Sequence, residues 1–240
     1  MPDQAPALRA VEVTAGYDAG PVVHGVSVTA GGGEVVSVLG PNGSGKSTLL
    51  KAIVGVLPLT SGSVLVGDAD VTRAAPEDIT RTGVGYVPQV DDVFAPLTVR
   101  ENLEMGGYLL PRSELPGRID TVLEVFPRLR GMLTRRAGRI SGGERKMLAM
   151  ARVMMLRPDV FVLDEPTANL APAVARELLS TQVRRLASGG AAVLIVEQRA
   201  TAALEISDRA YVLSGGRLRM EGTPAELSAS ADFVHSFLGR

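Results

Sequence analysis

Gly40-Pro41-Asn42-Gly43-Ser44-Gly45-Lys46-Ser47 is the most informative segment of this 240-residue chain. It matches the pattern G-x-x-x-x-G-K-[ST] in full, in which glycines let successive backbone N–H groups turn inward around phosphate oxygens. The apolar run 35–39 before it predicts a buried strand, and residues 48–54 after it predict a helix. A glycine-rich turn without a ligand is the alternative, but the complete pattern between a strand and a helix argues against it. The segment therefore predicts a phosphate-binding loop in an α/β fold.

Two side chains of this loop would carry its chemistry. The ammonium group of Lys46 would bridge the outer phosphates of a nucleotide, and the Ser47 hydroxyl would ligate Mg²⁺. The start of the following helix adds a favourable field for anions. We assign the segment from Gly40 to Ser47, together with Thr48, to nucleotide binding.

A pair of carboxylates follows another predicted strand. The apolar run 160–163 ends in Asp164 and Glu165, and parallel sheets place their chemistry where such strands end. Asp164 would hold Mg²⁺, and Glu165 would position a water against the terminal phosphate as a base or orienting group. Asp-Glu after a strand more often starts a loop when it occurs alone. The phosphate loop upstream favours the functional interpretation.

The chain as a whole is predicted to be one domain, residues 1–240, of the α/β class. Short runs of Val, Ile and Leu alternate with helical patterns, which is typical of a mostly parallel sheet. Between residues 89 and 157 the strand patterns stop, so we interpret this segment as a helical subdomain inserted into a core of residues 1–88 and 158–221. Residues 222–240 would form a helical tail.

The predicted elements fall into three groups. Antiparallel strands at one edge are expected at 8–13, 22–29 and 63–66. Further strands of the core are expected at 83–87, 192–196 and 209–213. Helices are expected at 99–110, 117–126 and 141–156, and a tail helix begins at the capping pattern Thr223-Pro224-Ala225-Glu226.

Composition excludes several classes of function. The net charge is -1, which does not suggest a nucleic-acid-binding tract, and the chain has no cysteine for disulfides or thiolate metal sites. The N-terminus has no export pattern, and the longest apolar runs fall far short of the roughly 20 residues that span a bilayer. We therefore expect a chain that is soluble in itself and reaches a membrane only through a partner.

Ile140-Ser141-Gly142-Gly143-Glu144 narrows the prediction to one family. It resembles the L-S-G-G-Q signature of ABC ATPases, with Ile for Leu and Glu for Gln. Ser141 and Glu144 also fit a capping box for the following helix, and both interpretations can hold. The resemblance implies ATP and Mg²⁺ as ligands. It also implies that Ser141, Gly142, Gly143 and Glu144 contact the nucleotide on an opposing subunit, so that one copy cannot complete a site.

Other positions match the ABC family in the expected order. Tyr17 resembles the aromatic residue that stacks on adenine, with an ordinary surface tyrosine as the alternative. Gln89 resembles the glutamine that contacts Mg²⁺ or water and hinges the helical subdomain. Gln198 lies where most members have a switch histidine. The segment Thr98-Val99-Arg100-Glu101-Asn102-Leu103 is similar to the family's T-V-x-E-N-L sequence. The resemblance thus adds Gln89 and Gln198 to Glu165 as catalytic residues, and Gln89 to the Mg²⁺ ligands.

Within the family, one branch is most similar. Residues 126–129, 169–172, 196–198 and 236–239 resemble the second ATPase of branched-chain amino-acid importers. The resemblance implies a second ATPase subunit (unlike, or a copy of this chain), two membrane permeases and, indirectly, an external solute-binding protein. It places the chain on the cytoplasmic face of the inner membrane, held by the permeases. Importers of urea or short amides, an exporter ATPase and a soluble non-transport ABC protein are the alternatives.

Some positions depart from the family pattern. Ala171 replaces the usual aspartate of the loop that contacts the opposite subunit, and Asn169 replaces a glycine of the branch. Gln198 can hydrogen-bond a phosphate or water but cannot become a cation as histidine can. We therefore hypothesise slower hydrolysis at the site that holds this chain's phosphate loop. Measuring each site of a heterodimer separately would reject this if both turned over equally.

Several residues are expected to have structural roles only. His24 and His235 are isolated, without a partner at ligand spacing. Met147, Met150, Met154 and Met155 recur at helical spacing, which favours core packing, although methionine also suits an adaptable contact surface. The arginines between residues 128 and 139 are expected to form a solvated face, with contact to anionic lipid or permease loops as the alternative.

Overall fold

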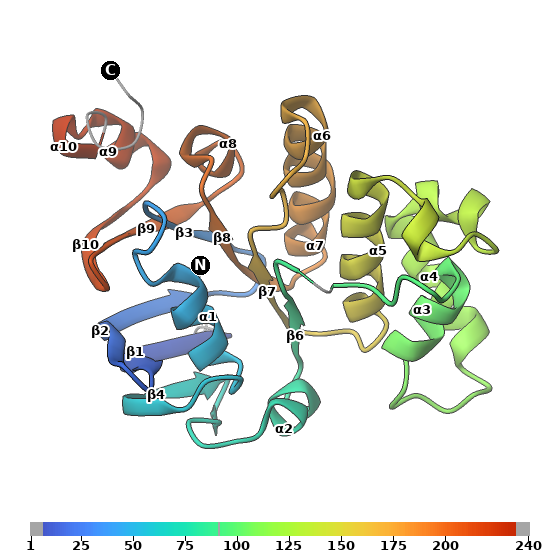
Figure 1. Cartoon of the computed structure of the whole chain (residues 1–240), viewed down its shortest axis with the longest axis horizontal. Helices are drawn as coiled ribbons and strands as arrows, with labels where there is room; N and C mark the ends of the chain where they lie inside the picture. Colours follow the sequence, from blue (N-terminus) through green and yellow to red (C-terminus); the bar gives the residue numbers. More distant parts are fainter. Residues whose placement is uncertain (1–6, 91, 234–240) are drawn as a thin grey trace.

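Short buried strands form the centre of a six-stranded sheet in this computed structural model, which describes residues 7–90 and 92–233. The strand order is β10-β9-β3-β8-β7-β6, and all neighbours are parallel except the pair β9–β10 (Figure 1). Every residue of β3, β7 and β8 is buried, as expected of strands covered on both faces. The strands are β3 (Val35–Leu39), β6 (Val84–Val87), β7 (Val160–Asp164), β8 (Ala192–Glu197), β9 (Arg209–Ser214) and β10 (Arg217–Gly222).

The predicted antiparallel strands form a sheet of their own, in the order β2-β1-β4-β5. Helix α1 lies between the two sheets, because its residues Leu49, Leu50 and Ile53 share one hydrophobic cluster with strands of both. This packing fixes the start of α1 at the end of β3. The elements are β1 (Leu8–Tyr17), β2 (Gly20–Ala30), α1 (Lys46–Ile53), β4 (Leu59–Val66), β5 (Ala69–Asp70) and α2 (Pro76–Arg81).

Helices replace strands between β6 and β7, and they stand to one side of the two sheets (Figure 1). The predicted helix 99–110 ends earlier, at Gly106, where a Cβ would collide with the Arg152 carbonyl oxygen of the neighbouring helix. Glycine therefore lets the two helices approach closely and ends the first of them. The elements are α3 (Val99–Gly106), α4 (Leu115–Val125), η1 (Pro127–Met132), η2 (Ala137–Arg139) and α5 (Gly142–Met154).

The methionine stripe of α5 and its surroundings packs as a core. Met147, Met150 and Met155 are buried in the same hydrophobic cluster as Leu103 of α3, and Met154 packs partly buried against it. Arg128, Arg130, Arg135, Arg136 and Arg139 are all exposed. The packing role of the methionines is therefore observed, and the arginine side chains are exposed in this chain by itself, as both interpretations of that segment require.

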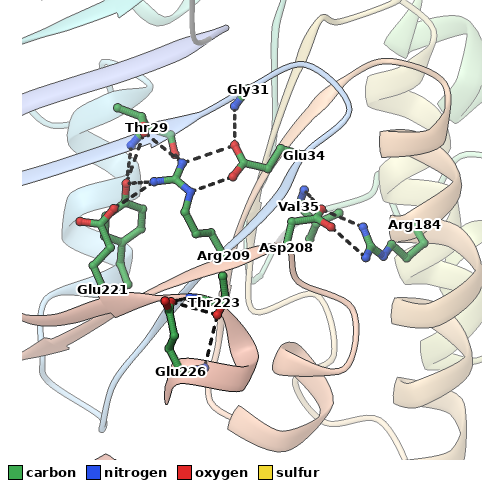
Figure 2. A network of polar contacts seen from close by, with 11 residues as sticks. Thr29, Gly31, Glu34, Val35, Arg184, Asp208, Arg209, Glu221, Thr223 and Glu226 are labelled. Carbon is green, nitrogen blue, oxygen red and sulfur yellow. Dashed lines mark hydrogen bonds and ion pairs between the residues drawn. The ribbon is translucent and has the colours of Figure 1, made fainter. Parts of the chain in front are cut away.

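One arginine ties the two sheets together on the side of β3 away from the phosphate loop (Figure 2). Arg209 of β9 donates to Glu34 (Nε–Oε1 2.8 Å), to Glu221 of β10 (Nη1–Oε1 3.0 Å) and to the Thr29 carbonyl of β2 (Nη2–O 3.0 Å). The hydrogen bond to Glu34 is the largest cause of a raised Arg209 pKa. Beside it, Asp208 accepts from the Val35 backbone and from Arg184. These contacts join residues up to 180 positions apart and hold β3 at its start.

The C-terminal helices pack against the parallel sheet at β3 and β9, because Leu227 and Phe233 share a hydrophobic cluster with Leu39 and Val212. The predicted capping box is present, since the Thr223 hydroxyl accepts from the Glu226 backbone and the Glu226 carboxylate accepts from the Thr223 backbone.

His24 is half-buried in β2, and His235 lies outside the described residues. No helix in the described part of the chain is long and apolar enough to cross a bilayer. The remaining elements are α6 (Pro172–Glu177), η3 (Leu178–Val183), α7 (Arg184–Ser188), α8 (Ala200–Leu204), α9 (Pro224–Ala229) and α10 (Ala231–Phe233).

Candidate functional site: a phosphate loop and a carboxylate held by two amides

The phosphate loop joins β3 to α1. Gly45 is the N-cap of α1 with φ 97°, and a Cβ there would lie 3.0 Å from a Val23 methyl group, so this position requires glycine. A glycine N-cap brings no side chain to bond the first-turn amides, and that turn contains no acidic residue. The N–H groups at the start of α1 are therefore available to an external anion.

Lys46 lies across the loop that precedes it. Its Nζ donates to the carbonyl oxygens of Gly40 (2.8 Å) and Pro41 (3.0 Å), and the residue is only 4% exposed. Burial lowers the pKa of Lys46, whereas the nearby carboxylates of Glu165 and Asp164 act in the opposite direction. The ammonium group is thus held at the loop, close to two acids.

Ser47 and Asp164 meet at the edge of the parallel sheet. The Ser47 hydroxyl donates to Asp164 Oδ1 at 2.9 Å. Asp164, the last residue of β7, is 2% exposed, and burial raises the pKa of its carboxyl while the Ser47 hydrogen bond opposes that shift. Both side chains offer hard oxygen ligands, which suit Mg²⁺ that also binds substrate phosphates. The buried hydroxyl of Ser44 lacks a hydrogen-bond partner among the described residues. It lies in the cavity that the phosphate loop lines, together with Ser47.

Two glutamine side-chain amides donate hydrogen bonds to the Glu165 carboxylate. Gln89, just after β6, donates from Nε2 to Oε2 of Glu165 at 2.7 Å. Gln198, just after β8, donates from Nε2 to both carboxylate oxygens at 2.8 Å. Glu165 itself has φ 45°, a left-handed conformation that costs a non-glycine residue about 1 kcal/mol or more. Three strand ends therefore converge to orient one strained carboxylate.

Two connected cavities bring most of the predicted site residues together. The first, of about 250 Å³, is lined by Val22, Asn42, Gly43, Ser44, Gly45, Lys46, Ser47, Thr48, Gln89, Glu165 and Gln198. The second, of about 200 Å³, is lined by Gln89, Glu165, Thr167, Ala168, Asn169, Glu197, Gln198 and Arg199. Glu165 and its two amides belong to both, so they stand between the phosphate loop and the loop that leads to α6.

Two groups of predicted residues lie elsewhere. Tyr17, at the end of β1, is 51% exposed and lines neither cavity. Ser141 is the N-cap of α5, which lies away from α1 across β6 and β7 (Figure 1). The predicted capping box is present, because the Ser141 hydroxyl accepts from the Glu144 backbone and the Glu144 carboxylate accepts from the Ser141 backbone at 2.7 Å. The helix tip at 141–144 thus lines neither cavity beside this chain's own phosphate loop.

The structure also shows residues that the sequence did not single out. Glu197, 2% exposed at the end of β8, accepts from both the backbone and the hydroxyl of Thr167. Burial raises the pKa of Glu197. Arg199 donates to the Leu170 carbonyl at 2.7 Å, which links the segment after β8 to the loop before α6. Glu197 follows an apolar run just as Asp164 does, so the same strand-end argument would have found it.

Comparisons with known proteins agree with this geometry. The family description "ABC transporter" matches residues 23–168. The "Probable branched-chain amino acid transport ATP-binding protein LivF" of Archaeoglobus fulgidus is 42% identical over 233 residues, 97% of this chain and 98% of the relative. The "High-affinity branched-chain amino acid transport ATP-binding protein BraG" of Pseudomonas aeruginosa is 40% identical, over 90% and 93% of the two chains. An ATP-binding cassette of an ABC transporter, solved in its ADP conformation, is 27% identical with TM-score 0.87 and coverage of 98% and 100%.

The fold and the phosphate loop define the class first: a P-loop ATPase with a mostly parallel sheet. Within that class, the chain belongs to the ABC transporter family. The family resemblance and the α/β fold expected from the sequence are both confirmed.

Proposed function

We propose that the chain is the ATP-hydrolysing subunit of an importer of branched-chain amino acids, and that it works as one half of a pair joined through nucleotide. The two relatives reported above, 42% and 40% identical, are named for branched-chain amino acid transport. The observation that carries the catalytic part is the Glu165 carboxylate, which two amides orient at the edge of the cavity lined by the phosphate loop.

Each predicted site residue has a defined task in this proposal. The amides of 42–48 and the Lys46 ammonium bind the phosphates, and Tyr17 stacks on the adenine. Ser47, Asp164 and Gln89 would hold Mg²⁺, which shields phosphate charge when bound. Glu165 accepts a proton from the attacking water, and Gln89 and Gln198 keep its carboxylate facing that water. This assignment needs no movement of the backbone of β7.

The α5 tip, residues 141–144, would complete the site of a second ATPase subunit, which is an unlike chain or a copy of this one. It lines no cavity with this chain's own phosphate loop, and its two glycine amides lie outside the capping box. Residues 89–157 then act as the helical subdomain, set against a core of 1–88 and 158–221, with 222–240 as a tail.

Two membrane permeases are the other direct partners in this proposal, and they would hold the chain at the cytoplasmic face of the inner membrane. A cavity of about 470 Å³ opens between α2, β6, α3 and α5. Large apolar side chains at its rim are exposed, among them Val56 (53%), Met105 (49%) and Tyr108 (58%). Exposed apolar clusters of this kind fit an apolar helix of a partner protein. An external solute-binding protein would act through the permeases.

A complementation experiment tests the shared site. The experiment uses conditions in which the wild-type chain hydrolyses ATP as a pair of identical copies. There we expect Lys46→Ala and Ser141→Arg each to abolish ATP hydrolysis, and an equal mixture of the two chains to regain up to about one quarter of wild-type activity. In a mixed pair, one site carries both defects and the other carries neither. A mixture as inactive as its components, although the two chains associate in pull-downs, would place both motifs in one chain's site and contradict the proposal.

A further inference from the structure

Lys146 of α5 is a buried lysine that the assigned chemistry does not use. Its Nζ donates to the Gln89 carbonyl oxygen at 2.7 Å and forms an ion pair with Asp92 Oδ2, also at 2.7 Å. The two side chains are only 10% and 12% exposed. The Gln89 carbonyl accepts the hydrogen bond of the ammonium group, whereas the contact with Asp92 is an ion pair without hydrogen-bond geometry. The residue whose amide touches Glu165 is therefore tied by its own backbone to α5.

A second cation of the same helix holds the same segment further along. The Arg152 guanidinium lies 4.8 Å from the centre of the Phe94 ring. The backbone of Phe94 is in turn held from α3, because its N–H donates to Asn102 Oδ1 at 2.8 Å and its carbonyl accepts from Asn102 Nδ2 at 3.0 Å. The backbones of Gln89 and Phe94 are thus both held by the helical region, whereas the Gln89 side chain reaches Glu165 in the core.

We propose that Lys146 is a positioning residue for ATP hydrolysis, which holds the backbone of Gln89 so that the Gln89 amide meets Glu165. Lys146 stands about one helical turn beyond Ser141, so the same contact sets the distance between the Gln89 amide and the α5 tip. The inference rests on the proposed function and adds a residue to it. Lys146 touches neither cavity, and it acts only through Gln89.

The competing account is that Lys146 only stabilises the helical region. A buried ion pair is weak evidence for stability, because desolvation of both charges offsets their attraction. Arg118 of α4 offers a matched control for this account. It is also buried, at 7% exposure, and it also binds the backbone around α5, where its guanidinium donates to the carbonyls of Met154 and Met155. These contacts lie at the far end of α5 and do not reach Gln89.

The absence of cysteine from the chain allows a direct test. Lys146→Cys removes the ammonium group, and alkylation of that single cysteine with 2-bromoethylamine in denaturant, followed by refolding, restores an ammonium at nearly the same reach. The full chain is assayed in both forms for kcat, KM and ATP affinity, beside Arg118→Met and a wild-type chain carried through the same refolding. Asp92→Asn serves as a second variant that keeps the lysine.

We expect Lys146→Cys to lower kcat at least tenfold while ATP affinity changes less than threefold, and alkylation to restore at least half of the lost kcat. Asp92→Asn should lower kcat about threefold, and Arg118→Met should leave it within twofold despite a lower melting temperature. Unchanged kcat in Lys146→Cys, or an equal loss in Arg118→Met, would overturn the inference alone. A wild-type chain that binds ATP but does not hydrolyse it, either alone or together with the second ATPase subunit of its transporter, would instead overturn the proposed function.

Discussion

Helices α1 and α5 both begin at glycine-rich segments, but their first turns are completed in opposite ways. At α1 the N-cap is Gly45, without a capping side chain, and Lys46, Ser47 and Asp164 surround the open end. At α5 the N-cap is Ser141, and Glu144 completes a capping box from within the same turn. The first backbone N–H groups of α1 are therefore available to a ligand, whereas at α5 two backbone N–H groups already donate to side chains of the same turn.

The difference shows why two such ends suit one shared site. The open end can bind phosphate alone, because a lysine and carboxylates of the same chain lie beside it. The capped end is stable without ligand and adds only the glycine amides and the helix field, which is a weak anion site by itself. A weak, preformed tip is appropriate if it must release its ligand each time two subunits separate.

Lys46→Ala should have the largest effect among substitutions at the two helix starts. It removes the ammonium group from the open start of α1, and a charge-assisted bond between such a group and phosphate contributes about 2–3 kcal/mol. We expect ATP affinity to fall roughly 30- to 160-fold by titration calorimetry. The variant also loses the Lys46 hydrogen bonds to the Gly40 and Pro41 carbonyls, so urea unfolding without nucleotide should show a stability lower by about 1–3 kcal/mol. Unaltered ATP affinity would mean that the open end does not bind the phosphates.

Gly143→Ala tests the packing of the α5 tip. A Cβ at residue 143 would lie 2.7 Å from a Val174 methyl group of α6, so either the Val174 side chain or the helices must shift. Overpacking of this kind costs about 1–3 kcal/mol, measurable as a lower urea midpoint with an unchanged slope. Combining it with Val174→Ala should recover most of the loss. If the double variant stays as unstable as the single one, the contact with α6 is not the cause.

Ser141→Ala removes the cap of α5. Loss of a serine N-cap costs about 1 kcal/mol, and Thr223→Ala, which breaks the matching box of α9, provides the control. Both variants should lose similar stability and bind ATP like the wild type, but only Ser141→Ala should lower kcat. Equal kcat in the two variants would reduce Ser141 to a structural cap.

Glu144→Gln should have the smallest effect. Glutamine can keep the capping box, so only the favourable charge at the helix start is lost, about 0.3–1 kcal/mol at low salt. The same change removes a negative charge from a tip that is proposed to face a triphosphate. We therefore expect slightly lower stability together with up to a few-fold tighter ATP-dependent pairing, measured by analytical ultracentrifugation. Weaker pairing would show that the carboxylate itself contributes to the contact.

The sequence best predicts those parts of the site that are formed by consecutive residues. The phosphate loop follows from one octet, and Asp164 and Glu165 follow from their place after an apolar run. The helix start at Ser141 could be predicted for the same reason, since a capping box spans only four residues. Gln89 and Gln198, by contrast, have no local pattern and were found only through family resemblance.

The contacts that sequence does not predict join distant residues. Lys146 donates to a carbonyl 57 positions away in the sequence, and Arg209 donates to the Thr29 carbonyl 180 positions away. Local periodicity cannot predict either contact. Strand β10 was missed because its apolar residues are few and only half-buried at an edge of the sheet. That the antiparallel strands form a separate sheet, with α1 between the two, depends on packing rather than on strand propensity.

The left-handed backbone of Glu165 has a practical consequence for anyone who engineers this chain. Glycine would adopt φ 45° at no steric cost and would remove a like charge beside Asp164 and Glu197, against the loss of the hydrogen bonds from Gln89 and Gln198. Selection for thermal tolerance alone therefore does not protect the carboxylate that is proposed to activate water. Libraries screened only by heat can therefore drift toward inert proteins. A turnover assay has to accompany every round of such a selection.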